Sequence, residues 1–281
     1  MDFRLFSKLI LIEQTFFAMP FALIGVIFAG GGTIITWVLA IVALAAARTA
    51  GMSFNRVIDA QIDAKNPRTS DRPVPKGEIK TSTVWWTAII SSIVLIASSL
   101  MLNRLCFYLS FPAVAMLFTY SYFKRFSSSS HFYLGFVEAA APIGGYLAVT
   151  GEFALVPFVL GLAIMSWIAG LDIVYALQDM DFDSKQGLHS IPVQMGKEKA
   201  LLLSLTSYII SICALIYAGI LAHMGLVYWI SLIPIAAIFT YQQILARRKD
   251  IVSSINTFFK VNMFISPILL LGSLMDELII N

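Results

Sequence analysis

Apolar residues along this chain come in nine long blocks separated by polar connections. The blocks lie near residues 13–31, 34–57, 82–102, 105–123, 132–150, 154–178, 200–222, 226–245 and 260–280. Most are close to the ~20 residues with which an α-helix spans a bilayer. Barrel strands would instead alternate polar and apolar residues over about ten positions, and no block does so. The pattern predicts an all-α polytopic membrane protein with nine transmembrane helices.

Composition agrees with this interpretation. The 281 residues are 59% hydrophobic and only 12% charged, whereas soluble domains carry about 25% charged residues. Arg4 and Lys8 precede the first block as in a signal peptide, but no A-x-A-like cleavage site follows, so we expect this block to be retained. No separate soluble stretch interrupts the blocks. We therefore expect one transmembrane domain, 1–281, that lies in a lipid bilayer and does not bind nucleic acid.

The basic residues predict the orientation of the bundle. Two connections are long, 58–81 and 179–199, and both follow an even-numbered helix. Seventeen of the 19 Lys and Arg residues fall on that same side, Arg48 and Arg104 being the exceptions. Positive charge marks the cytoplasmic side of membrane proteins. The long connections, and any active site built on them, are therefore expected to face the cytoplasm from a bacterial-type cytoplasmic membrane.

Two acidic motifs stand at the cytoplasmic ends of the second and sixth predicted helices. Residues three or four apart share a helix face, so each motif forms one stripe of oxygen-bearing side chains. The stripes are Asn55, Asp59 and Asp63, and Asp172, Tyr175, Asp179 and Asp183. Paired carboxylates suit Mg²⁺, a cation that takes oxygen ligands and usually shares them with substrate phosphates. Two such pairs facing each other would hold metal ions that clamp a diphosphate.

Basic residues accompany the acidic motifs. The residues that we expect to bind the diphosphate are Arg68, Arg72, Lys76, Lys124 and Lys185. Together with a metal they would neutralise a leaving diphosphate, and electrostatic stabilisation of this kind is often the largest catalytic contribution. Acidic residues at a single helix end often do no more than meet water. Two copies on one side, with basic loops attached, favour a functional site.

At these residues the chain resembles the UbiA superfamily of intramembrane prenyltransferases. The first motif is similar to NDxxDxxxD, here Asn55–Asp63, and the second to DxxYxxxDxxxD, here Asp172–Asp183. The resemblance extends over essentially the whole chain. Arg56 stands where familiar members carry Asp, which removes one possible metal ligand. The stretch IEQTFFAMPFALIG looks like the 4-hydroxybenzoate and hydroxynaphthoate branch.

The resemblance implies a helix bundle around a central cavity and a Mg²⁺-dependent transfer reaction. A polyprenyl group would pass from its diphosphate to an aromatic acid, with metal on Asp59, Asp63, Asp179 and Asp183. The first acceptor is 4-hydroxybenzoate, as in ubiquinone-type biosynthesis, and the second is a hydroxynaphthoate, as in menaquinone biosynthesis. Asp172, with Tyr175 beside it, would orient or deprotonate the acceptor hydroxyl.

Some alternatives stay open at this point. Glu138 lies within an apolar block, where an ionised carboxylate is costly, and would either face the acceptor or bond to a neighbouring helix. Arg48 shares the face of Asn55 and would either hold an acceptor carboxylate or pair with another helix. A membrane transporter also places acids in helices, but usually near the midplane and in two related halves. Here the acids cluster at one interface.

Overall fold

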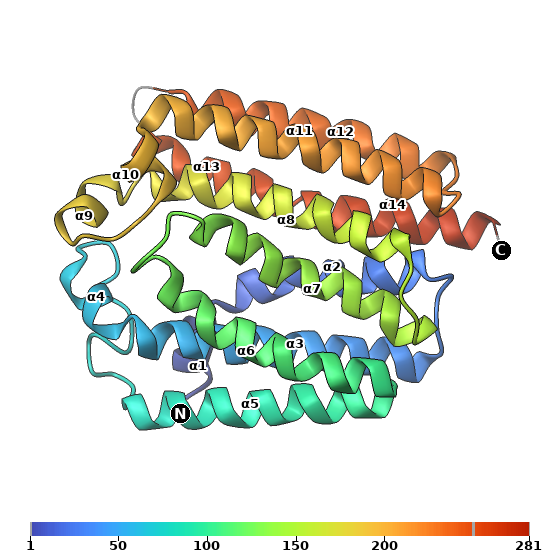
Figure 1. The fold of residues 1–281 in the computed structure, drawn as a ribbon, viewed down its shortest axis with the longest axis horizontal. Helices are drawn as coiled ribbons and strands as arrows, with labels where there is room; N and C mark the ends of the chain where they lie inside the picture. Colours follow the sequence, from blue (N-terminus) through green and yellow to red (C-terminus); the bar gives the residue numbers. More distant parts are fainter. Residues whose placement is uncertain (1, 249–250, 281) are drawn as a thin grey trace.

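The structure is a computed structural model that describes residues 2–248 and 251–280, and it consists of long helices that run along one common direction (Figure 1). The helices of this part are, in chain order, α1 (Phe3–Ile10), α2 (Ile12–Phe28), α3 (Ile34–Ile58), α4 (Ala60–Lys65), α5 (Thr81–Leu102), α6 (Arg104–Phe123), α7 (Ser130–Thr150), α8 (Leu155–Ala176), α9 (Met180–Lys185), α10 (Ile191–Met195), α11 (Lys197–Leu221), α12 (Leu226–Ala246), α13 (Ile251–Asn262) and α14 (Ile265–Ile280). The expected all-α fold is confirmed.

The candidate membrane spans correspond to the predicted apolar blocks. Within the described residues, eight spans are long and apolar enough to cross a bilayer, the last of them being Ser254–Ile279, which takes in most of α13 and α14. A ninth candidate is the pair α1 and α2, bent by 63°. Leu11 separates the two in the left-handed region, with φ of 50°. The first block was thus predicted without its preceding short helix, and the last without most of α13.

Helix α8 forms the centre of the core because its apolar residues face neighbours on several sides. Trp167 is fully buried, with its ring 5.4 Å from that of Phe21 on α2 and 5.8 Å from that of Phe239 on α12. Its indole Nε1 donates to Asn262 Oδ1 of α13 at 3.0 Å. A buried indole N–H needs such a partner. The helix that carries the second acidic motif is therefore fixed against three others.

Small residues bring α2 and α7 into close contact. A Cβ on Gly25 would lie 2.1 Å from the carbonyl oxygen of Pro142, and one on Gly145 would lie 2.0 Å from that of Ala22. Real side chains do not tolerate such distances, so both positions require glycine. Close backbone approach through small residues is the usual packing mode of transmembrane helices.

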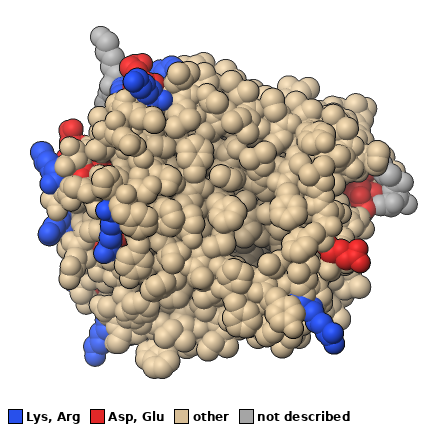
Figure 2. All heavy atoms as spheres, in the orientation of Figure 1, with Lys and Arg blue, Asp and Glu red and all other residues tan. Residues whose placement is uncertain are grey.

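The surface has the distribution of charge expected of a membrane protein. Figure 2 shows most of the Lys and Arg on this face gathered at the end of the bundle that carries α4, α9 and α10, while the middle is almost free of charge and is hollowed. Apolar side chains such as Trp86, Ile90 and Ile233 are exposed within the spans. In water such exposure would be costly, whereas in a bilayer these side chains face lipid.

Candidate active site

The two acidic motifs adopt the same local structure. Asp59 stands at the junction between α3 and α4 with φ −93° and ψ 3°, and Asp179 begins α9 with φ −98° and ψ 3°. The helical hydrogen bonds continue past each junction, since Asp63 N–H donates to the Asp59 carbonyl at 2.8 Å and Asp183 N–H to the Asp179 carbonyl at 2.7 Å. Each spanning helix thus ends in a short helix that keeps the acidic side chains near its end.

The carboxylate of Asp59 is buried among nitrogen donors. Asn55 Nδ2 donates to its Oδ2 at 2.9 Å, which confirms that these two residues share a helix face. Lys124 Nζ lies 2.9 Å from Oδ2, and Arg125 Nη2 lies 3.4 Å from Oδ1. One turn later, Asp63 is also buried and pairs with Arg72, whose Nη1 lies 2.7 Å from its Oδ2.

Asp179 is bound by residues that follow the first motif in the sequence. Arg68 donates to its two oxygens from Nε at 3.0 Å and from Nη2 at 2.5 Å, the paired geometry that guanidinium and carboxylate prefer. Asn66 Nδ2 donates to Oδ1 at 3.1 Å. The Arg68 guanidinium also donates to the hydroxyl of Tyr175 and lies 4.9 Å from its ring centre. The connection after α4 therefore joins the two motifs into one cluster.

The charges in this cluster act on each other. Burial tends to lower the pKa of Arg68, but its hydrogen bond to Asp179 and the nearby Tyr175 raise that pKa above its ordinary value. Burial, with the neighbouring Asp179 charge, raises the pKa of Asp183 to about 6. The Asp183 carboxylate therefore takes up a proton closer to neutral pH than an ordinary aspartate does.

Asp172 lies on α8, farther from the end of the bundle than Asp179, which is the N-cap residue of α9. It pairs with a histidine that the sequence motifs did not indicate. His131 Nδ1 on α7 is 2.7 Å from Asp172 Oδ2, with the histidine side chain buried and the carboxylate partly open. The hydroxyl of Tyr120 on α6 faces the same region and interacts electrostatically with Asp172 and Asp59. The charges of Asp172 and of Asp59 in the first motif therefore both act on Tyr120.

Arg48 and Glu138, for each of which the sequence left two roles open, contact each other. Arg48 Nη1 lies 2.5 Å from Glu138 Oε1, and the two side chains are 16% and 11% exposed. They form an ion pair between α3 and α7. Arg48 Nε is buried without a hydrogen-bond partner. Tyr120 interacts electrostatically with both members of this pair as well as with Asp172.

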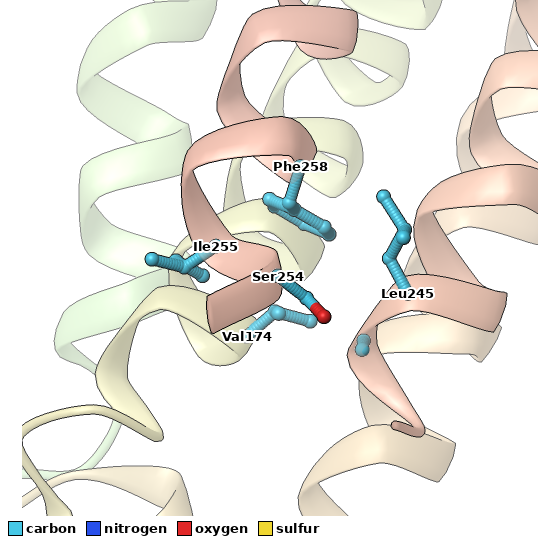
Figure 3. Close-up of a pocket in the computed structure, with 6 residues that line it drawn as sticks. Val174, Leu245, Ser254, Ile255 and Phe258 are labelled. Carbon is cyan, nitrogen blue, oxygen red and sulfur yellow. The ribbon is translucent and has the colours of Figure 1, made fainter. Parts of the chain in front are cut away.

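Apolar packing holds the end of α8 in place. Figure 3 shows the narrow pocket between α8, α12 and α13, which is lined by Val174, Leu245, Ile255 and Phe258. These side chains belong to one buried cluster at the same end of the bundle. The ring of Phe259 meets that of Tyr175 edge-on at 5.0 Å. Tyr175 therefore approaches Arg68 from a rigid support.

Two of the basic residues expected to bind diphosphate, Lys76 and Lys185, form no ion pair with a motif carboxylate among the described residues. Lys76 is exposed and pairs with exposed Asp71 at 2.8 Å, and Lys185 is exposed on α9. By contrast, Arg68, Arg72 and Lys124 each contact a motif carboxylate. Arg56, the departure from the familiar motif, is buried and donates from Nε to the Leu9 carbonyl at 3.3 Å, tying α3 to α1.

Three contacting residues were not predicted from the sequence: Asn66, Arg125 and His131. Asn66 lies two positions before Arg68 and Arg125 immediately follows Lys124, and their amide and guanidinium groups were the available signal. His131 lies 41 positions from Asp172, so no spacing rule could have joined them.

The donor set bears on metal binding. Among the described residues, no three His, Cys, Asp or Glu side chains converge as a group that could hold a metal by themselves. The carboxylates instead come in pairs at two junctions, with Asn55 beside the first. Mg²⁺ is usually bound by one or two carboxylates and completed by substrate phosphates and water. The residues therefore fit a Mg²⁺ shared with a phosphate-bearing substrate, not one held in an all-protein cage.

The chain is similar in sequence to curated enzymes of named activity. The chain is 29% identical over 225 residues to a 4-hydroxybenzoate octaprenyltransferase of Pectobacterium atrosepticum, covering 79% of this chain and 78% of the relative. It is 28% identical over 229 residues to the enzyme of that name from Alkalilimnicola ehrlichii, covering 82% and 78%.

Solved structures show the same fold. The apo structure of a UbiA homologue from Aeropyrum pernix K1 superposes with a TM-score of 0.88 at 29% identity, covering 94% of this chain and 98% of that one. A UbiA homologue from Archaeoglobus fulgidus bound to GPP and Mg²⁺ gives 0.71 at 21% identity, covering 95% and 99%. Residues 18–268 match the UbiA prenyltransferase family. This chain, an integral membrane enzyme that transfers prenyl groups, therefore belongs to the UbiA prenyltransferase family.

Proposed function

We propose that this enzyme transfers a polyprenyl group from its diphosphate to 4-hydroxybenzoate, in the manner of the relatives named for that reaction. The observation that carries the proposal is the cluster in which Asp59, Asp63 and Asp179 each contact a Lys or Arg, above the more deeply placed Asp172. A transporter would not need this joint acidic and basic site at one end of the bundle. We also propose that 1–281 works as one transmembrane domain.

The diphosphate would bind between the two motifs. Mg²⁺ would be held by Asn55, Asp59, Asp63, Asp179 and Asp183, and it would supply charge neutralisation for the leaving diphosphate. Arg68, Arg72 and Lys124 already lie against the motif carboxylates, so they would be within reach of the oxygens of a phosphate held there. Lys76 and Lys185 would contribute through the wider positive potential of the same end. Positive charge at this end supports a site that faces the cytoplasm.

The acceptor would occupy the space bordered by Asp172, Tyr120 and Arg48. Arg48 would bind the acceptor's carboxylate through guanidinium N–H groups that Glu138 does not use, because a guanidinium binds carboxylates through paired N–H groups. Asp172 would face the phenolic hydroxyl, with Tyr175 between it and the cationic cluster. An aromatic acid with its hydroxyl opposite its carboxyl meets both demands, which favours 4-hydroxybenzoate.

The reaction would replace the allylic C–O bond of the prenyl diphosphate by a C–C bond to the aromatic ring. The allylic C–O bond breaks and its electron pair leaves with the diphosphate. Asp172 accepts the proton of the acceptor hydroxyl while the ring carbon ortho to that oxygen forms the new C–C bond. Loss of the proton on that carbon restores the aromatic ring, and Asp172 returns its proton to the oxygen. The products are the prenylated acid, pyrophosphate and one proton.

The test offers two acceptors separately to the purified enzyme in lipid. Radiolabelled octaprenyl diphosphate and Mg²⁺ are added with either 4-hydroxybenzoate or 1,4-dihydroxy-2-naphthoate, and the lipid extract is assayed for labelled product. We expect product with 4-hydroxybenzoate and its loss on addition of EDTA. Product with the naphthoate alone would show that the enzyme catalyses the menaquinone-type reaction instead. Product with neither acceptor would refute transfer to an aromatic acid.

A further inference from the structure

His131 connects the deepest acidic residue of the site to the connection that follows the second motif. It lies in the first turn of α7 and is 4% exposed. Nδ1 contacts Asp172 Oδ2 at 2.7 Å, and Nε2 accepts a hydrogen bond from the backbone N–H of Ile191 at 3.2 Å. Ile191 is the first residue of α10, where backbone N–H groups have no partner within the helix.

These two contacts fix the position of the imidazole proton. A backbone N–H can only donate, so His131 Nε2 must accept with its lone pair and carries no proton. The ring proton of the neutral imidazole then resides on Nδ1 and is donated to Asp172. The hydrogen bond made by one ring nitrogen commonly sets the state of the other in this way. Asp172 receives this bond on Oδ2, which leaves Oδ1 for a further donor.

We propose that His131 is a positioning residue for prenyl transfer, which holds Asp172 through its Nδ1–H so that the other carboxylate oxygen faces the acceptor hydroxyl. The inference rests on the proposed function, because it needs a phenolic acceptor. His131 touches no reacting atom. It would act by orienting Asp172. The Ile191 N–H would hold the imidazole ring in place, so that the connection after α9 keeps a fixed position relative to the acceptor site.

The other groups that face Asp172 do not duplicate this contact. Tyr120 on α6 and Tyr175 on α8 interact with it electrostatically. Arg48 and Glu138 face each other and Tyr120. Neither tyrosine has a hydrogen bond to Asp172 among the contacts of the described residues, whereas His131 meets it at hydrogen-bond distance.

The experiment uses three substitutions that separate the two ends of the imidazole. H131F removes both nitrogens. H131N places an amide N–H where Nδ1 lies and can still donate to Asp172, whereas H131Q reaches the position of Nε2 and can accept from Ile191 N–H. The matched control is H189F, since His189 is an exposed histidine of the neighbouring connection. For each variant, kcat and the KM values for the prenyl diphosphate and for the aromatic acid are measured in lipid, together with Tm.

We expect H131F and H131Q to lower kcat about tenfold or more, the effect of losing one hydrogen bond to a charged group. The KM for the diphosphate should change less than about twofold, because the hydrogen bonds of His131 go to Asp172 and to the Ile191 backbone and not to a metal-binding carboxylate. H131N should restore the larger part of the rate, and H189F should match the wild type. A merely structural role would instead lower Tm and activity together in all three His131 variants.

Several results would overturn the proposal. They are a wild-type kcat in H131F, an activity of H131Q equal to or above that of H131N, or losses that follow Tm alone. If H131F fails to fold, the comparison of H131N with H131Q decides the matter by itself. The proposed function is judged separately: wild-type enzyme that makes no prenylated acid would refute it, whereas wild-type product with an insensitive His131 would refute only the present inference.

Discussion

The ion pair between Arg48 and Glu138 gives a stability prediction that can be worked out from its burial. With side chains 16% and 11% exposed and the charged atoms 2.5 Å apart, the pair lies between the limits of surface and fully buried pairs. Removing one partner of a buried pair costs about 3–5 kcal/mol, because the other charge is left uncompensated. The residual exposure places E138L near the lower limit, at about 3 kcal/mol.

The double substitution R48M/E138L is the informative comparison. It replaces both charges by apolar side chains of similar length, and such replacements are often neutral or stabilising. We expect it to recover most of the stability lost in E138L, with a coupling energy of about 2 kcal/mol. Unfolding is followed by tryptophan fluorescence in mixed micelles with increasing SDS.

The same variants separate stability from function. R48M/E138L should fold stably yet bind the aromatic acid more weakly, seen as a higher KM for the acceptor, because the donor proposed for its carboxylate is gone. If E138L is as stable as wild type, or if the double variant is less stable than E138L, the reasoning from burial is wrong. An unchanged acceptor KM in the double variant would contradict the role proposed for Arg48.

Three further predictions concern other parts of the molecule. D59A or D179A should abolish turnover and Mg²⁺-dependent binding of radiolabelled octaprenyl diphosphate while Tm stays within a few degrees of wild type; a variant with normal turnover would remove that residue from the metal site. Because burial and the Asp179 charge raise the pKa of Asp183 to about 6, the metal-free enzyme holds a proton there below that pH and releases it above. Apparent Mg²⁺ affinity, measured by the Mg²⁺ dependence of diphosphate binding, should therefore fall as the pH is lowered from 7 to 5. The D183N variant should lose most of this pH dependence. An equal pH dependence in D183N would mean that another group is responsible. At the opposite end, buried Asp276 accepts from backbone N–H groups at the start of α12, including that of Val227 at 3.0 Å. D276A should cost about 1–2 kcal/mol by analogy with the loss of a helix cap, seen as a lower Tm with unchanged kcat, whereas an unchanged Tm would deny the capping role.

The spans were predictable because the bilayer imposes a simple rule on the sequence. A helix in lipid needs about 20 apolar residues, so composition alone marks its position to within a few residues. The short helices escaped this rule. α4, α9 and α10 have five or six residues each and lie in connections whose sequence is that of polar loops. The bend at Leu11 also has no apolar signature, since the chain stays hydrophobic on both sides of it.

The site was predictable only along single helices. Helical spacing placed Asn55 and Asp59 on one face, and their side chains meet at 2.9 Å. Contacts between helices follow from tertiary packing, which spacing does not describe. For this reason neither the pairing of Lys76 with Asp71 nor the contact of His131 with Asp172 was predicted. For Arg48 and Glu138 the structure shows the alternative of a bond to a neighbouring helix, because each residue is the other's partner.

The central claim is that the two acidic motifs form one site for prenyl transfer. The most direct measurement is the stoichiometry of pyrophosphate release and prenylated 4-hydroxybenzoate in proteoliposomes, with octaprenyl diphosphate and Mg²⁺. We predict that one pyrophosphate is released for each prenylated acid formed, and that both products are lost on addition of EDTA. Release of pyrophosphate without prenylated acid, or formation of the acid unaffected by EDTA, would contradict it.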